Sequence, residues 1–423
     1  MEESTKTKAV RIYGVEDLRL EEFELPAIKE DEILAKIVSD SVCMSTFKLA
    51  EQGAGHKRAP KDIDKNPVIV GHEFCGEIVE VGAKWQDKFK PGMKFAIQPN
   101  INPTTTLYAP GYSYQYCGGD SQYVIIPARA MEVDALLNYE NDVFYFGSLA
   151  EPMSCIIGGF HTNYHTTPGV YEHRMGIVEG GNCAILAGVG PMGLGAIDYA
   201  LHCDRKPGRL VVTDIDDARL ERASRIYTVE HAKECGVELH YVNTREPESI
   251  DYIMSLTGGK GYDDVFVYAP VKPVVEQGSK LLAFDGCLNF FAGPTNTEFS
   301  AMFNFYNVHY AAQHLCGSSG GNTDDMIEAI EMMNSGKINP SAMITHVGGL
   351  DAAAETTINL PKIPGGKKLI YTHISMPLTA IDDFAKLGET DPMFAELAKI
   401  VEAHSGLWCP EAEKYLLANA KVL

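Results

Sequence analysis

The sequence predicts an α/β protein joined to a mainly β part, with a barrel-like first domain and a doubly wound parallel sheet in the second. Three observations predict it: short β-rich runs between turn signals in the first third, apolar strands alternating with helical patterns from residue 182, and a glycine-rich turn between one such strand and its helix. A chain of 423 residues with 45% apolar and 22% charged residues has room for two or three domains and has ordinary globular composition.

The first domain is predicted from strands that turn residues interrupt. Turn signals occur at Gly82, Pro91-Gly92, Pro110-Gly111 and Gly118-Gly119. The β-rich runs lie at 9–13, 33–38, 77–81 and 122–126. Runs of this length with glycine and proline between them favour an antiparallel, barrel-like arrangement.

The second domain is predicted from strands that alternate with helices. The apolar strands are 183–187, 210–213, 264–268 and 287–291, and the helical patterns are 218–224, 249–256, 274–283 and 323–334. Such alternation indicates βαβ units and a parallel sheet. A strand at 342–346 is expected to return to the first domain. The acidic, largely helical tail from 375 to 423 is expected to serve surface packing or subunit contact.

Charge and cysteine usage limit the partners. Asp and Glu number 57 against 36 Lys and Arg, a formal charge of −21, which disfavours nucleic acid and membrane surfaces as partners but leaves a small anionic substrate possible. The ten cysteines are dispersed and include no Cys-x-x-Cys pair, so a disulfide framework is not expected. The polar first residues and the lack of a long apolar run favour a cytoplasmic protein.

The glycine-rich turn is a candidate dinucleotide site. The strand 183–187 is followed by Gly188-Val-Gly190-Pro191-Met192-Gly193, a G-x-G-x-x-G pattern that opens a helix. Asp214 closes the next strand, where a carboxylate would accept hydrogen bonds from a ribose 2′-hydroxyl, which favours NAD(H). Arg219, one turn further on, keeps NADP(H) possible. The alternative is a similar sheet with an ordinary tight turn.

Three separate segments carry residues of the kind that bind metals. A thiol at Cys43, an imidazole at His72 and a carboxylate at Glu151 form a plausible three-ligand set for Zn²⁺ with one open position. The spacing does not establish this set, because the residues lie 29 and then 79 positions apart. A single histidine is commonly a hydrogen-bonded core residue, and a single cysteine a small apolar one.

Together these residues resemble the zinc-containing medium-chain dehydrogenase/reductase family. The resemblance rests on Gly71-His72-Glu73, a Cys-x-Ser at 43–45, Glu151-Pro152, the Gly118-Gly119 pair and the nucleotide fingerprint, and it extends over most of the chain through 71–78, 285–294, 304–310, 317–326 and 366–371. It implies a GroES-like catalytic domain followed by a Rossmann domain. With a glutamate at position 151, the chain resembles the polyol dehydrogenase branch of the family, because alcohol dehydrogenases carry a cysteine at this position.

The resemblance implies roles for individual residues. Cys43, His72 and Glu151 would bind one catalytic zinc, and Glu73 would support them or exchange as a ligand. Ser45 would be the hydroxyl that passes on the substrate proton.

The sequence also departs from the family pattern. Thr46 stands where the family usually has aspartate, and Lys48 where a relay histidine is common; the lysine could relay a proton, neutralise a substrate phosphate or lie in solvent. The four-cysteine lobe of the structural zinc is missing, because 98–120 contains only Cys117. A second, structural zinc is therefore not expected.

The resemblance implies oxidation and reduction of a polyol phosphate, interconverting a ketose phosphate and a hexitol phosphate of the L-sorbose 1-phosphate and D-glucitol 6-phosphate type. A basic cluster at Lys57 and Arg58 could clamp the phosphate, or could be a solvated loop. The alternatives are a dehydrogenase of an unphosphorylated polyol or secondary alcohol and, remotely, a non-catalytic NAD(P)-binding sensor.

The expected architecture is a GroES-like domain at 1–165 with 341–376 returning to it, a Rossmann domain at 166–340 and a helical extension at 377–423. The family also implies a homo-oligomer, a dimer or tetramer.

Overall fold

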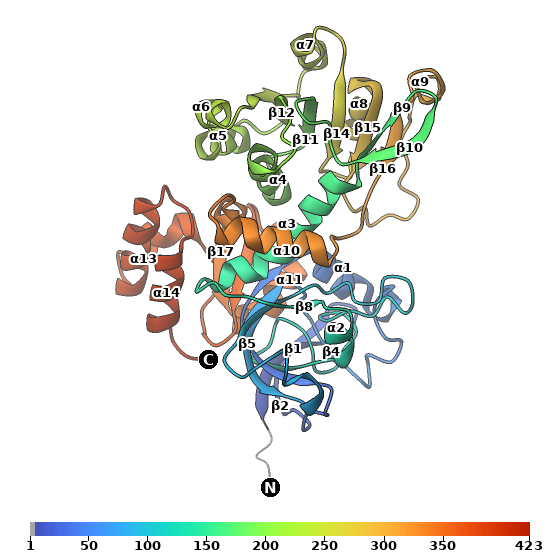
Figure 1. The fold of residues 1–423 in the computed structure, drawn as a ribbon. Helices are drawn as coiled ribbons and strands as arrows, with labels where there is room; N and C mark the ends of the chain where they lie inside the picture. The colour runs from blue at the N-terminus through green and yellow to red at the C-terminus, as the bar shows by residue number, and fades with distance from the viewer. Residues whose placement is uncertain (1–4) are drawn as a thin grey trace. The chain divides into compact units, whose positions relative to one another are not determined.

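The computed structural model describes residues 5–423, and these group into two compact units (Figure 1). The first comprises the chain up to Glu151 together with Asn322–Asn334 and Ile344–Leu423, and the second comprises Pro152–Gly321 and Ser335–Met343. The first is built mainly on antiparallel strands and the second on a parallel sheet with helices, which confirms the predicted fold class. The domain boundaries given above stay a prediction.

The first unit is organised around one long buried strand. An eight-stranded sheet has the order β19-β17-β18-β3-β5-β6-β8, with β7 also paired to β3, and a second sheet has the order β2-β1-β4. The strands are β1 (Lys6–Gly14), β2 (Asp17–Glu24), β3 (Ile33–Val42), β4 (Val68–Ile69), β5 (Phe74–Val81), β6 (Lys94–Ile97), β7 (Tyr123–Ile126), β8 (Leu136–Asn138), β17 (Ile344–Gly349), β18 (Lys367–Tyr371) and β19 (Thr379–Ala380). All pairs are antiparallel except β17 with β18.

Strand register brings distant segments to the end of β3. Asp40 is paired with Phe74 of β5, and Val42 is paired with Lys368 of β18. The residues just before β5 and at the start of β18 therefore lie next to Cys43, which follows β3 directly. This juxtaposition builds the candidate site.

The C-terminal helices form part of the core of the first unit. Trp408 is fully buried and donates its indole N–H to the Tyr371 hydroxyl at 2.9 Å. Glu413 accepts hydrogen bonds from the backbone N–H groups of Phe144 and Tyr145 at 2.7 and 2.8 Å, which caps the start of α3. The helices grouped here are α1 (Met44–Gln52), α2 (Ala128–Glu132), α10 (Thr323–Asn334), α11 (Ala353–Asn359), α12 (Phe384–Leu387), α13 (Pro392–Ala403) and α14 (Pro410–Asn419), and α3 (Phe144–Thr162) begins here and continues into the second unit.

The second unit holds a six-stranded parallel sheet in the order β13-β12-β11-β14-β15-β16. Its strands are β11 (Asn182–Leu186), β12 (Arg209–Asp214), β13 (Glu238–Asn243), β14 (Tyr262–Val267), β15 (Leu282–Phe290) and β16 (His314–Cys316), and an antiparallel hairpin is made by β9 (Tyr164–Thr167) and β10 (Val170–Met175). Its helices are α4 (Pro191–His202), α5 (Asp217–Ile226), α6 (Val229–Glu234), α7 (Ser249–Leu256), α8 (Lys272–Leu281) and α9 (Phe305–Tyr310).

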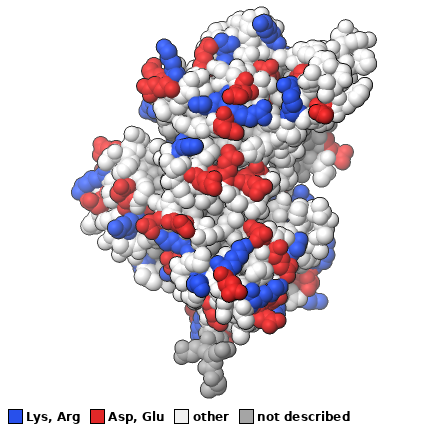
Figure 2. Space-filling view, viewed as in Figure 1, with Lys and Arg blue, Asp and Glu red and all other residues white. Residues whose placement is uncertain are grey.

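Two features of the described residues bear on partners. Acidic and basic side chains are interspersed over the face drawn in Figure 2. Among residues 5–423, no helix combines the length and the apolar character needed to cross a bilayer.

Candidate metal centre and nucleotide-binding turn

The candidate metal centre forms where β3 ends and α1 begins. Cys43 is the N-cap residue of α1, and its sulfur accepts a hydrogen bond from the Ser45 backbone N–H at 3.5 Å. His72 and Glu73 immediately precede β5, and the Glu73 carbonyl accepts a hydrogen bond from the Ser41 N–H at 3.0 Å. The sheet therefore holds a thiol, an imidazole and a carboxylate against one another.

Three of the predicted ligands lie within coordinating range. One ligand atom from each of Cys43, His72 and Glu73 lies within 4.8 Å of the other two. A thiolate, a neutral imidazole and a carboxylate form a donor set that suits Zn²⁺. The residues therefore fit the metal that the sequence predicts.

Glu151 lies outside this group of three but near it. It is a buried residue of α3, and its charge contributes to raising the pKa of the Cys43 thiol. Burial is the main cause of that rise, to about 12, followed by the charge of Glu73. A thiol in such surroundings ionises when a cation binds it. Glu73 therefore lies within range of Cys43 and His72, and Glu151 as a ligand stays a prediction.

Hydrogen bonds on both ring nitrogens orient His72. Thr46 Oγ1 lies 3.1 Å from Nδ1, and the Tyr112 hydroxyl lies 3.1 Å from Nε2. Burial lowers the pKa of His72 well below its usual value, and the Arg58 charge adds to this, so the ring is neutral as a ligand must be. Thr46, which departs from the family pattern, thus occupies the position of a ligand-orienting group.

A buried ion pair holds Glu73. Lys367 Nζ lies 2.6 Å from both carboxylate oxygens, and both side chains are almost fully buried. The charge of Lys367 compensates that of Glu73 and also opposes the rise in the pKa of Cys43. The sequence patterns indicate neither Lys367 nor Tyr112. Lys367 lies in the segment 366–371 quoted for the resemblance, and Tyr112 follows a Pro-Gly turn, but neither signal indicates a role.

The two predicted proton-transfer residues lie on the first turns of α1. A hydrogen bond links the Ser45 side chain to Tyr112, whose pKa burial nevertheless raises well above its usual value. Burial lowers the pKa of half-buried Lys48, while the Cys43 charge opposes the shift and Lys57 adds to it. Ser45 is thereby hydrogen-bonded to the same hydroxyl that contacts His72.

The predicted basic cluster adjoins this centre. The Arg58 guanidinium lies 4.9 Å from the centre of the Tyr112 ring, and its buried Nε has no hydrogen-bond partner among the described residues. Lys57 is exposed. Burial lowers the pKa of His56 to about 4, and the charges of Arg58, Lys57 and Lys48 contribute to that shift. The segment 56–58 therefore places positive charge beside the candidate metal ligands.

The nucleotide fingerprint has the geometry of its motif. Gly190 is the N-cap residue of α4, Pro191 and Met192 begin the helix, and a Cβ on Gly190 would meet nothing within 4 Å. A Cβ on Gly193 would approach the Gly188 carbonyl oxygen to 2.2 Å, so only glycine fits there. The turn therefore leaves open space before a helix N-terminus, where a pyrophosphate binds favourably.

The end of β12 carries the predicted ribose contact. Asp214 Oδ1 accepts hydrogen bonds from the N–H groups of Ile215 and Asp216 at 2.8 and 3.1 Å. The exposed side chain of Arg219 lies 3.9 Å from the Asp216 carboxylate. Arg245, which the sequence analysis did not single out, donates to the Ile215 carbonyl at 2.7 Å and places a second cation near this strand end.

Comparison with known proteins bears on both sites. Residues 29–134 match the family described as alcohol dehydrogenase GroES-like domain, and residues 191–335 match the zinc-binding dehydrogenase family. The chain is 55% identical to mannitol-1-phosphate 5-dehydrogenase of Aliivibrio fischeri, over 98% of each chain, and 50% identical to L-sorbose 1-phosphate reductase of Klebsiella pneumoniae, also over 98% of each.

A likeness to solved structures extends to the fold. The crystal structure of 2R,3R-butanediol dehydrogenase from Bacillus subtilis matches with a TM-score of 0.68 at 20% identity, covering 86% of this chain and 99% of that one. These findings confirm the family that the sequence resembles, and the likeness to L-sorbose 1-phosphate reductase that the segments 285–294 and 304–310 predict.

Proposed function

The chain belongs to the zinc-binding dehydrogenases that carry an alcohol dehydrogenase GroES-like domain and is an oxidoreductase of that family, and on this premise we propose that it interconverts a ketose phosphate and a hexitol phosphate with a nicotinamide cofactor. One observation carries the substrate class: the Arg58 side chain, whose buried Nε has no hydrogen-bond partner within residues 5–423, packs on Tyr112, which in turn contacts His72. Named relatives at 55% and 50% identity act on phosphorylated substrates, in agreement with this.

Cys43 and His72, with Glu73 or Glu151, would hold one zinc. When bound, the zinc supplies Lewis-acid polarisation of a substrate oxygen. With its proton on Nδ1, the nitrogen that faces Thr46, His72 would offer Nε2 to the metal, and the Tyr112 hydroxyl would then have to leave its present position. Lys367 holds the Glu73 carboxylate in place, with Nζ 2.6 Å from both of its oxygens.

Ser45 takes the proton in the direction of alcohol oxidation. Its hydroxyl is bonded to Tyr112, so the proton lost by the substrate hydroxyl passes along groups that are already hydrogen-bonded to one another. Lys48, whose pKa burial lowers, lies three positions further along α1 and would pass the proton onward. In the reductive direction the same groups return a proton to the carbonyl oxygen.

Arg58 and Lys57 bind the phosphate. A guanidinium N–H that is buried without a partner gains a hydrogen bond when a phosphate oxygen arrives, and charge-assisted bonds of this kind are strong. The surrounding cations, which include Lys48, add attraction for a dianion.

Gly190 and Asp214 would hold the pyrophosphate and the adenine-side ribose of the cofactor. The nicotinamide supplies the hydride acceptor for oxidation and the hydride donor for reduction. Asp214 favours NAD(H), while Arg219 and Arg245 leave binding of NADP(H) open. The homo-oligomer that the family implies remains part of the proposal.

A paired assay tests the proposal. Nicotinamide absorbance is followed with L-sorbose 1-phosphate and with mannitol 1-phosphate, each beside its unphosphorylated sugar or polyol, for the native chain and for Cys43→Ser. We expect turnover of at least one phosphate ester, far weaker turnover of the free compounds, and loss of turnover in Cys43→Ser with NADH binding retained. Equal rates with free compounds would replace the substrate class by neutral polyols, and full activity of Cys43→Ser would overturn the metal assignment.

A further inference from the structure

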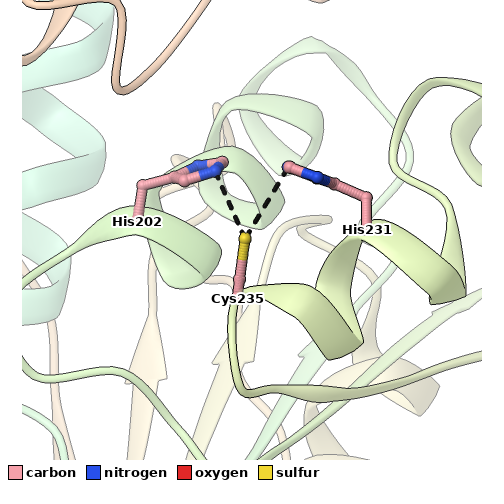
Figure 3. Close-up of side chains that lie close together, drawn as sticks. All are labelled: His202, His231 and Cys235. Carbon is pink, nitrogen blue, oxygen red and sulfur yellow. Dashed lines mark hydrogen bonds between the residues drawn. The ribbon is translucent and has the colours of Figure 1, made fainter.

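A second cluster of metal-binding side chains lies in the second unit and shares no residue with the proposed reaction. His202 ends α4, His231 lies on α6, and Cys235 is the C-cap residue of α6 (Figure 3). His231 and Cys235 are four positions apart and therefore share one face of the helix end. Figure 3 shows both imidazoles directed toward the Cys235 sulfur.

The distances match those of a tetrahedral zinc site. Cys235 Sγ lies 3.6 Å from His202 Nε2 and 3.7 Å from His231 Nε2, and one ligand atom from each residue lies within 4.8 Å of the others. Zinc bound at about 2.3 Å from sulfur and about 2.0–2.1 Å from nitrogen separates the two ligand atoms by about 3.6 Å. Both imidazoles are therefore spaced from the sulfur as zinc ligands would be.

A carboxylate orients the ring of His202, and a second carboxylate lies near His231. His202 Nδ1 lies 3.0 Å from Oδ1 of buried Asp198 and 2.8 Å from its backbone carbonyl, so Nδ1 carries the proton and the Nε2 lone pair faces the sulfur. Asp198 is fixed in turn by the Asn339 N–H, 2.7 Å from Oδ2. Glu234 Oε2 lies 3.8 Å from His231 Nδ1. A carboxylate behind a ligating imidazole is the usual support of a metal-bound histidine.

We propose that His202, His231 and Cys235 bind a zinc ion, with water at the fourth position. Two imidazoles and a thiolate are borderline and soft donors that prefer Zn²⁺ to Mg²⁺ or Ca²⁺. The His231 side chain is 48% exposed, so an ion can enter from solvent. The Lys206 ammonium, which donates to the Cys235 carbonyl at 2.9 Å, opposes a cation there, while the carboxylates of Asp198 and Glu234 compensate it.

Such an ion would tie α6 to the end of α4, the helix that the nucleotide fingerprint opens. The site is distinct from the four-cysteine lobe of the family's structural zinc, which this sequence lacks. Without a metal, the same geometry would amount to one thiol shared weakly between two imidazoles.

Metal content measures this site separately from the catalytic one. The full-length Cys43→Ser/His72→Ala chain, which lacks two ligands of the first centre, is loaded with ZnCl₂, freed of unbound ion by gel filtration and analysed for zinc. We expect about one zinc per chain, a roughly tenfold lower content when Cys235→Ser or His231→Gln is added, and no change with the control Cys203→Ser. NADH binding checks that each variant is folded.

Cobalt gives a second readout. Co²⁺ added to the same proteins should produce a sulfur-to-cobalt charge-transfer band that Cys235→Ser removes and Cys203→Ser keeps. Zinc should also raise the Tm of the Cys43→Ser/His72→Ala chain and not that of the chain carrying Cys235→Ser in addition. Absence of bound zinc from the first protein, or equal zinc in the proteins with and without Cys235, would overturn the proposal.

Discussion

Lys367 and Glu73 form a buried ion pair across 294 positions of sequence, with Nζ 2.6 Å from both carboxylate oxygens and side chains only 7% and 1% exposed. The pair joins the start of β18 to the residue before β5. The charge of Lys367 compensates the charge of the Glu73 carboxylate, which is buried away from water beside Cys43.

Removing the lysine alone should destabilise the protein severely. Lys367→Met leaves the Glu73 carboxylate buried and unpaired, at a cost of about 3–5 kcal/mol in the free energy of unfolding. The double variant Lys367→Met/Glu73→Gln should recover much of that loss, because no charge is then left unpaired. Urea unfolding of the metal-free proteins measures both. Equal stability of Lys367→Met and the native chain would mean that Glu73 finds another partner.

Neutralising the basic cluster should affect phosphorylated substrates selectively. Lys57→Ala/Arg58→Ala should raise KM for a phosphate ester by roughly 10- to 100-fold, as expected for loss of charge-assisted hydrogen bonds, with little effect on an unphosphorylated polyol. Lys65→Ala, which removes an exposed charge from the following loop, is the matched control. A similar rise in KM for the neutral polyol would argue against a phosphate clamp.

Asp214 should set the choice of dinucleotide. Asp214→Ala should weaken NADH binding by roughly tenfold relative to NADPH, since the ribose acceptor is lost while Arg219 and Arg245 remain. Fluorescence titration of both cofactors measures the ratio, and Asp204→Ala on an exposed loop serves as control. A ratio unchanged from that of the native chain would remove Asp214 from the ribose site.

Glu413 should give stability a specific pH dependence. Burial raises the pKa of Glu413 from 4.5 to about 7, against the hydrogen bonds from Phe144, Tyr371 and Tyr145. Between these pH values the folded chain holds a proton that the unfolded chain has released, so stability falls as pH rises, by up to about 3 kcal/mol, and is flat above pH 7.

The comparison with Glu413→Gln isolates this contribution. Stability of the native chain minus that of the variant, from unfolding curves between pH 4 and 8, should fall as pH rises from about 4.5 to about 7. A difference that grows with pH would mean that the three donors outweigh burial and hold the carboxylate ionised.

The sequence predicts many strands of the structure but does not predict the long helix α3. The helical patterns at 249–256 and 323–334 coincide with α7 and α10, and the run at 33–38 lies inside β3. By contrast, α3 was not predicted, because Pro152 in its interior and several glycines disfavour helix in any local assessment. Packing of Tyr145 and Leu149 into the core of the first unit outweighs that propensity.

The candidate site was predictable only in part. Cys43 and His72 are indicated by residue type and resemblance, and the structure brings them together with Glu73. The residues that contact these ligands are not indicated by the sequence. Lys367 reaches Glu73 because β18 pairs with β3, and spacing along the chain does not predict that pairing. Tyr112 likewise approaches His72 from a loop that the sequence marks only as a turn.

The Glu413 carboxylate of α14 accepts hydrogen bonds from the first turn of α3, and this contact has a practical consequence for handling the protein. That helix carries Glu151, and the last residues are themselves fastened, with Val422 bridged to Ile374. Proteolytic clipping near residue 405, or a bulky affinity tag on the C-terminus, would therefore disturb a helix that supplies a candidate ligand. Purification tags belong at the N-terminus, and mass spectrometry of the C-terminus should precede any comparison of specific activity between preparations.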